Sequence, residues 1–237
     1  MGRVGLFSVQ VRKVNSGRPT LKLGAVSLIA FAAITVLVLL NLSQTFDAQA
    51  ALAINHYYLG APLTEFMEFV SKFGREYFWI PVLAVMLVLG NRTTKLLALE
   101  LTVLFAVSAV AGETMKLIVF RSRPFENLNS IITRLPASTD SSYPSGHALI
   151  VAAGATFSLL KFKKKIAAAL LTAEAAFVCY SRVYVGLHYP LDVAGSIFLA
   201  GAVVGIGLFI LERCMDKPLN HAVSLTMRIF KEGKLAL

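Results

Sequence analysis

The stretch that decides the fold is residues 24–42, which read GAVSLIAFAAITVLVLLNL. It contains no charged residue, and its length matches the roughly 20 apolar residues that a helix needs to cross a bilayer. A cleaved secretion signal has an apolar core of only roughly 7–15 residues. We therefore predict that this stretch is a retained membrane anchor.

Five further apolar stretches follow along the chain. We place them near residues 77–90, 96–115, 147–160, 166–181 and 191–211. The stretches at 77–90 and 147–160 are short for a full span, so we expect them to extend into their flanks or to begin in a protein-lined cavity. The chain has 237 residues, of which 57% are hydrophobic and 15% charged, and a soluble domain of this size rarely carries so little charge. The expected fold is all-α, a polytopic bundle of six transmembrane helices in a single domain.

The basic residues indicate how this domain lies in the membrane. With the N-terminus inside, 16 of the 23 Lys and Arg residues fall in inner segments and 7 in outer ones. Cytoplasmic loops collect Lys and Arg, so we predict that both termini are cytoplasmic. The domain then consists of a cytoplasmic arm (1–22), a six-span core (23–211) and a cytoplasmic tail (212–237).

The net charge of +10 could suggest a nucleic-acid partner. The basic residues are scattered between apolar blocks, however, and a membrane origin explains the excess better, so no nucleic acid is expected. Cys179 and Cys214 have no disulfide or zinc-site spacing, and we interpret them as small packing residues.

The outer connections are the long ones. Residues 43–76 include Asp47 to Leu59, which could form a helix lying at the membrane interface. Residues 116–146 form a polar loop between the third and fourth spans. Three polar clusters fall in or beside the outer connections: Lys116 with Arg123-Pro124, Pro144-Ser145-Gly146-His147, and Ser181-Arg182 with His188 and Asp192.

The cations of these clusters suit a phosphate. An Arg guanidinium matches two phosphate oxygens with its planar fork, whereas Lys acts as a point charge. Ser145 and Gly146 open a predicted helix, whose backbone N–H groups and dipole favour an anion. Gly146 also has no side chain to block close approach.

Two histidines and an aspartate add reactivity. His188 and Asp192 are four residues apart, within reach of one another if the chain turns helically, and Pro190 suits the first turn of a helix. A carboxylate that holds one ring nitrogen of His188 leaves the other free to attack. His147 can then protonate the leaving oxygen.

The three clusters resemble the three-part signature of the type 2 phosphatidic acid phosphatase superfamily. Its members include lipid phosphate phosphatases, undecaprenyl diphosphate phosphatases, glucose 6-phosphatase and vanadium haloperoxidases. The resemblance implies that His188 is the nucleophile, Asp192 its orienting partner and His147 the general acid. It further implies that Lys116, Arg123, Arg182, Ser145 and Gly146 hold the phosphate, and that no metal or other cofactor is needed.

The resemblance also implies a substrate, a lipid phosphate whose tails stay in the membrane. We expect a polyprenyl diphosphate of the undecaprenyl kind, hydrolysed through a phosphohistidine on the outer side of the cell membrane. Phosphatidic acid, phosphatidylglycerophosphate and phosphoryl transfer to a second lipid remain as alternatives. A vanadium haloperoxidase is disfavoured by the six spans, and a non-catalytic lipid-binding protein would not need the His188–Asp192 pair.

Other polar residues have simpler explanations. Arg121, Arg134, Glu113 and Glu126 lie near the clusters in sequence, and a solvated or headgroup-facing position is at least as good an account as a role in admitting substrate. Glu174 falls in the middle of the fifth span, where a charge is costly. We expect it to be neutral and hydrogen-bonded inside the bundle.

Overall fold

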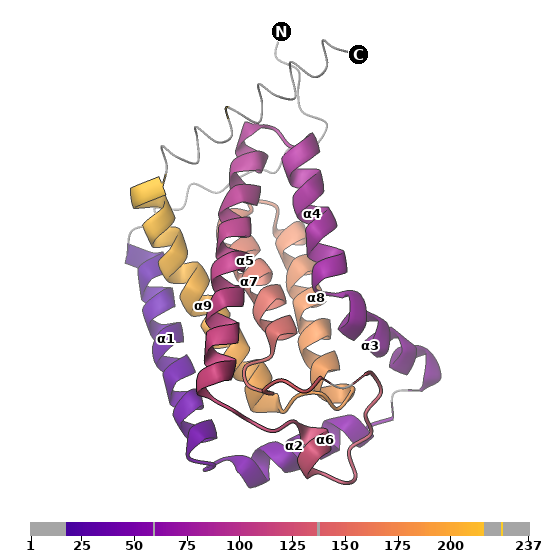
Figure 1. The fold of residues 1–237 in the computed structure, drawn as a ribbon. Helices are drawn as coiled ribbons and strands as arrows, with labels where there is room; N and C mark the ends of the chain where they lie inside the picture. The colour runs from indigo at the N-terminus through magenta and orange to yellow at the C-terminus, as the bar shows by residue number, and fades with distance from the viewer. Residues whose placement is uncertain (1–17, 59, 137, 216–223, 225–237) are drawn as a thin grey trace.

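The computed structural model describes residues 18–58, 60–136, 138–215 and 224, and it is built from helices (Figure 1). No β-strand occurs within these ranges, so the all-α prediction is confirmed. The helices are α1 (Arg18–Leu39), α2 (Gln44–His56), α3 (Ala61–Phe73), α4 (Glu76–Leu89), α5 (Arg92–Ile118), α6 (Pro124–Asn127), α7 (Gly146–Lys161), α8 (Lys165–Tyr184) and α9 (Pro190–Ile210), which continues as a π-helical turn, Leu211–Met215.

Each predicted apolar stretch forms one helix. Within the described residues, four helices are long and apolar enough to cross a membrane, namely α1, α5, α8 and α9 with its extension. The apolar helices α4 and α7 have 14 and 16 residues, in line with the short stretches in the sequence. At the N-terminus, α1 begins at Arg18, inside the segment assigned to the cytoplasmic arm, whereas residues 1–17 and most of the tail lie outside the described residues.

The connection 43–76 contains two helices. The first, α2, overlaps the helix predicted from Asp47 to Leu59 but begins and ends three residues earlier, and its position at the membrane interface stays a prediction. The second, α3, was not predicted, although Pro62 in its first turn is a usual helix-start signal. Helix α3 packs on α8 and contacts α4, so it covers part of α8.

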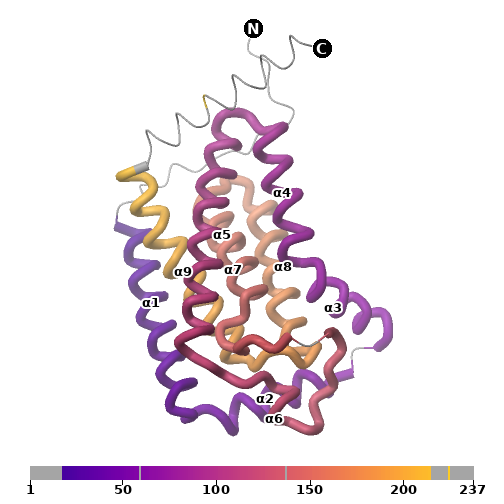
Figure 2. Tube along the Cα trace, viewed as in Figure 1, coloured from indigo at the N-terminus to yellow at the C-terminus, as the bar shows by residue number. Residues whose placement is uncertain are grey.

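The long helices alternate in direction along the bundle (Figures 1 and 2). As a result, α2, α3, α6, the loop that leads into α7 and the turn between α8 and α9 all gather at one end of the bundle. These connections carry the three polar clusters of the sequence. We call this end the polar end.

Close packing fixes the helices around α7, which contacts α5, α8 and α9 and buries most of its side chains. Helix α1 packs along α9 on the outside of this group. A Cβ atom added at Gly205 would lie only 2.7 Å from the Cα atom of Gly24. In a bilayer, the hydrophobic effect does not drive helices together, because lipid tails are as apolar as the side chains. Helices associate instead through close contacts between small residues such as these.

The loop before α7 is anchored to α1 by Tyr143, which is fully buried. Its hydroxyl lies 2.8 Å from the Oγ1 atom of Thr35, and its ring stacks on Phe31 with centroids 6.1 Å apart. A buried tyrosine needs such a partner for its hydroxyl. The anchor fixes where α7 begins, and with it the position of Ser145 and Gly146.

Candidate active site

The eight residues expected in the site meet at the polar end. Lys116 lies in the last turn of α5, Arg182 in the last turn of α8 and Arg123 just before α6. The remaining five lie where two helices begin. Ser145, Gly146 and His147 open α7, and His188 and Asp192 flank the start of α9.

His188 is held in one orientation. Only 2% of its surface is exposed, and its Nδ1 atom lies 2.8 Å from the carbonyl oxygen of Ser142. The Oδ2 atom of Asp192 is 3.6 Å from the same nitrogen. Because a carbonyl oxygen only accepts, Nδ1 carries the proton and Nε2 keeps its lone pair. That Nε2 atom lies 3.4 Å from a terminal nitrogen of Arg123, so the predicted nucleophilic nitrogen faces a cation that is predicted to bind phosphate.

The pKa of His188 favours the neutral ring. Burial lowers this pKa to about 4, the interaction with Asp192 opposes the shift, and the charge of Arg182 adds to it. Only the neutral imidazole has a free lone pair for attack. The site therefore keeps His188 reactive well below the usual pKa of a histidine.

We expect the acidic limb of kcat/KM to reflect this shift. Because the pKa is lowered, protonation removes the nucleophile only as pH falls toward about 4, so activity should persist at about pH 5. A pH–rate profile of the detergent-purified protein, corrected for the ionisation of the substrate, measures the limb. An acidic limb at the unshifted value of 6.5 would contradict the expectation.

Asp192 is fully buried and saturated with donors. Its Oδ2 atom accepts from the backbone N–H of Tyr189 at 2.8 Å and from the hydroxyl of Ser142. Its Oδ1 atom is 2.6 Å from Arg121. The carboxylate thus caps α9, orders the loop that holds His188 and faces the protonated Nδ1 atom.

Arg121 is the site residue that the sequence interpretation assigned wrongly. Instead of facing headgroups, its guanidinium bridges Asp192 and the buried Asp47 of α2, at 2.6 Å to each. It also lies 4.1 Å above the ring of Tyr189. Asp47 in turn accepts the backbone N–H of Leu191 at 3.0 Å. This network fastens α2 to the start of α9, and no motif links its members in the sequence.

Two arginines at the polar end have an N–H group without a hydrogen-bond partner among the described residues. Arg182 is buried, and its Nη1 atom donates to the hydroxyl of Ser71 at 2.8 Å. Its Nε atom has no hydrogen-bond partner among the described residues. Arg75, which was counted only as an outer basic residue, lies at the start of α7, because a Cβ atom on Gly146 would be 3.2 Å from its Nη1 atom. A buried N–H without a partner is costly, and a phosphate oxygen would satisfy it.

The sequence predicts that backbone N–H groups at the start of α7 bind an anion. The side chain of Ser145 accepts the N–H of Ala148 as an N-cap, and its own N–H donates to the carbonyl oxygen of Asp192 at 3.3 Å. The Ser145 N–H is therefore already hydrogen-bonded, and its expected role in binding an anion stays a prediction. The N–H groups of Gly146 and His147 lie in the first turn, where a helix offers no internal acceptor.

His147 is partly exposed beside this first turn. Burial lowers the pKa of its ring, and the positive charges of Arg182 and Arg75 lower it further, so the neutral ring is favoured. The ring therefore has to gain a proton before it can act as the predicted general acid, and this role stays a prediction.

Asp140 forms ion pairs with two of the predicted phosphate-binding cations. Its two carboxylate oxygens lie 2.6 Å from Lys116 and 2.6 Å from Arg123. Burial opposes its ionisation, but hydrogen bonds from Lys116, Ser138 and Arg123 hold its pKa well below the usual range. The carboxylate therefore takes the place that two phosphate oxygens would take.

We expect Asp140→Asn to bind an anion more tightly, because a competing charge is removed from Lys116 and Arg123. The side chain is 40% exposed, so the gain should be modest, about fivefold in the inhibition constant of inorganic phosphate or vanadate. Glu113→Gln is the matched control, since Glu113 contacts Lys116 alone at 2.9 Å and is 69% exposed. Weaker anion binding in Asp140→Asn would show that Asp140 positions the cations instead.

Comparison with known proteins now identifies the family. The profile of the PAP2 superfamily matches residues 97–215, a range that contains all eight expected site residues. The chain belongs to the PAP2 superfamily. An undecaprenyl-diphosphatase of Sulfolobus acidocaldarius is 42% identical over 160 residues, which cover 68% of this PAP2 chain and 73% of that protein. Undecaprenyl-diphosphatase BcrC of Bacillus subtilis is 28% identical, covering 71% and 83% of the two chains.

Solved PAP2 structures share the fold. A transmembrane PAP2-type phosphatidylglycerolphosphate phosphatase from Bacillus subtilis aligns with a TM-score of 0.62 and 23% identity, over 82% of this chain and 96% of that one. The structure of Aquifex aeolicus LpxE aligns with a TM-score of 0.55 and 26% identity, over 67% and 91% of the chains. The arrangement of helices described above is therefore similar to that of both solved structures.

Proposed function

We propose that this chain is an integral-membrane lipid phosphatase that hydrolyses a polyprenyl diphosphate of the undecaprenyl kind through a phosphohistidine. One observation carries the proposal. His188 is buried with Nδ1 tied to the Ser142 carbonyl at 2.8 Å, while its free Nε2 atom faces Arg123 at 3.4 Å. A nucleophile that points into a group of cations suits attack on phosphorus.

The steps follow from these positions. Nε2 of His188 forms a bond to the terminal phosphorus as the bond from phosphorus to the bridging oxygen breaks. His147 gives its proton to that oxygen, which leaves with the lipid phosphate. Lys116, Arg123 and Arg182 stabilise charge on the equatorial oxygens. Water then attacks the phosphorus as its bond to Nε2 of His188 breaks, His147 takes a proton from the water, and inorganic phosphate departs.

The substrate proposal rests on relatives that carry the name undecaprenyl-diphosphatase. Relatives with other names keep the rivals open: a lipid A 4'-phosphatase of Bacteroides thetaiotaomicron is 30% identical over 149 residues. We further propose that α4 and α7 complete a six-span bundle with both termini cytoplasmic and the polar end outside. The excess of Lys and Arg in the predicted inner segments, 16 against 7, supports this orientation. A C-terminal fusion to an enzyme active only outside the cytoplasm tests it, and an active fusion would contradict it.

The deciding experiment measures phosphate release by the detergent-purified protein in EDTA. Matched amounts of undecaprenyl diphosphate, phosphatidic acid and phosphatidylglycerophosphate are compared. We expect undecaprenyl diphosphate to give the highest kcat/KM. A higher value for either of the others would replace the proposed substrate but keep the reaction, and release that requires a metal would overturn the mechanism.

A further inference from the structure

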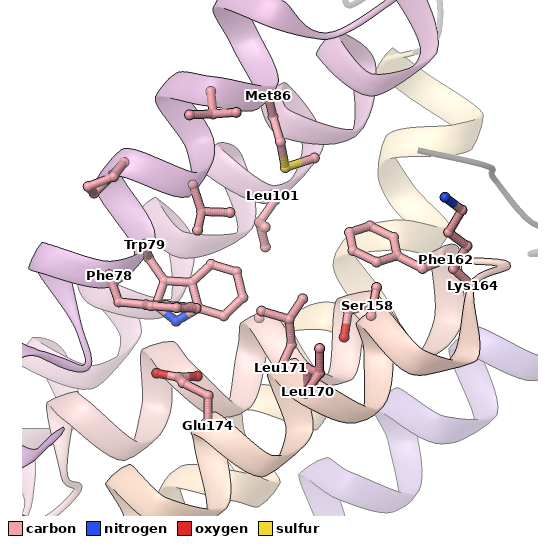
Figure 3. Close-up of a pocket in the computed structure, with 15 residues that line it drawn as sticks. Phe78, Trp79, Met86, Leu101, Ser158, Phe162, Lys164, Leu170, Leu171 and Glu174 are labelled. Carbon is pink, nitrogen blue, oxygen red and sulfur yellow. The ribbon is translucent and has the colours of Figure 1, made fainter. Parts of the chain in front are cut away.

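A large apolar cavity lies away from the active site, between α4, α5, α7 and α8 (Figure 3). Its volume is about 830 Å³, within the range of small-molecule pockets. The α7 residues that line it, Gly154 and Ser158, lie in the second half of that helix, far from Gly146. No residue assigned above to the active site lines it. Its walls are mainly apolar and include Phe78, Val82, Met86, Leu101, Phe162 and Leu171.

Two residues that line this cavity have buried polar atoms without a hydrogen-bond partner among the described residues. Trp79 is only 3% exposed, and its indole N–H has no hydrogen-bond acceptor among the described residues. Both carboxyl oxygens of Glu174 are buried and likewise without a donor. The expectation that Glu174 is hydrogen-bonded within the bundle is therefore wrong. In Figure 3 the indole nitrogen points toward the end of the cavity where the Glu174 carboxyl lies.

Unpartnered polar groups are costly in apolar surroundings. Here the two groups are complementary in kind, since an indole N–H only donates and a carboxyl group offers acceptor oxygens. A single hydroxyl satisfies both, because it accepts from the indole and donates to the carboxyl. We propose that the cavity binds a neutral lipid alcohol, with its hydroxyl between Trp79 and Glu174 and its hydrocarbon chain along the apolar wall.

Other headgroups fit less well. An ionised carboxylate or phosphate has no hydrogen to donate to the carboxyl oxygens of Glu174. An ether or ester accepts from Trp79 but likewise donates nothing to Glu174. The one cationic residue in the lining, Lys164, is labelled at the opposite end of the view from the polar pair.

A second cavity leaves room for a long chain. It has a volume of about 550 Å³ and is lined partly by α3, including Phe66 and Phe73. Phe78, Leu170 and Glu174 line both cavities. The polar pair therefore lies close to where the two apolar spaces adjoin. Leu170 is 66% exposed, which places this junction at the lipid-facing side of α8.

The protein contains its own probe, because Trp79 is its only tryptophan. Bromine quenches tryptophan fluorescence on contact, so the full-length protein in detergent micelles can be titrated with a dibrominated long-chain alcohol. The matched dibrominated fatty acid and methyl ester are run beside it. We expect half-quenching by the alcohol at about a tenfold lower mole fraction, since it adds a hydrogen bond to Glu174.

Two comparisons isolate the hydroxyl. Glu174→Leu should abolish the preference for the alcohol, whereas Glu65→Gln, which changes an exposed acid on α3 outside both cavities, should keep it. In the wild-type protein, unbrominated alcohol should reverse the quenching better than its methyl ether, so the test does not depend on a variant that folds. Equal quenching by all three lipids, or equal reversal by alcohol and ether, would overturn the proposal. Phosphatase activity plays no part in either outcome.

Discussion

Replacing His188 with alanine is expected to lower kcat for phosphate release by at least about 10⁴-fold, because the variant lacks the atom that forms the bond to phosphorus. The ring is held by Ser142 and faced by Arg123. Its loss removes the covalent route while the cations that bind the substrate stay in place. KM should therefore change much less than kcat.

A rapid-quench experiment with substrate labelled in its terminal phosphate provides the direct measurement. The wild-type protein should carry label that is stable in base and released in acid, as expected for a phosphohistidine, and His188→Ala should carry none. His56→Ala is the matched control, because His56 is an exposed histidine of α2 whose ring contacts the carbonyl oxygen of Ser130 at 2.7 Å. Near-normal turnover in His188→Ala would exclude it as the nucleophile.

Replacing Arg121 with alanine is expected to destabilise the fold by about 3–5 kcal/mol, because it leaves two buried carboxylates without their cation. Asp47 and Asp192 are both fully buried, and each lies 2.6 Å from the guanidinium. Activity should fall as well, since Asp192 orders the loop that holds His188. Arg121→Lys should recover only part of the loss, because one ammonium group cannot reproduce the planar fork that reaches both carboxylates.

Unfolding of the detergent-purified variants by denaturant measures this effect. The double variant Asp47→Asn with Arg121→Gln removes one carboxylate together with the cation, so it should lose less stability than Arg121→Gln alone. Arg134→Ala is a control, since the Arg134 guanidinium donates to backbone carbonyl oxygens, those of Asn55, Ile132 and Tyr184. If Arg121→Ala unfolded like the wild-type protein, the network would not stabilise the fold.

The structure changes how three residues of the site are understood. Ser142 and Arg121, which no motif includes, hold His188 and Asp192. Asp140 forms ion pairs with Lys116 and Arg123. Two of the three predicted phosphate-binding cations are thus paired with a carboxylate, and an anion that binds to them would have to displace it.

The sequence by itself determined the apolar helices and the gathering of the three polar clusters at one end of the bundle. Long apolar runs such as residues 24–42 dictate helices, because backbone groups in lipid must bond within their own segment. Alternation of direction then brings the connections that contain Arg123, Ser145 and His188 to one end. Helix-start signals at Ser145 and Pro190 likewise act over a few neighbouring residues, so they can be read locally.

Only the tertiary structure decided how these residues are held. Arg121 and Asp47 are 74 positions apart, and their pairing depends on how α2 packs against α9. The partner of His188 is the carbonyl oxygen of Ser142, a group that every residue has and no sequence pattern marks. For Glu174, the sequence predicts apolar surroundings. It does not predict that both carboxyl oxygens lack a hydrogen-bond donor among the described residues. Hydrophobicity and helix signals are local properties, whereas the pairing of distant polar groups is set by packing.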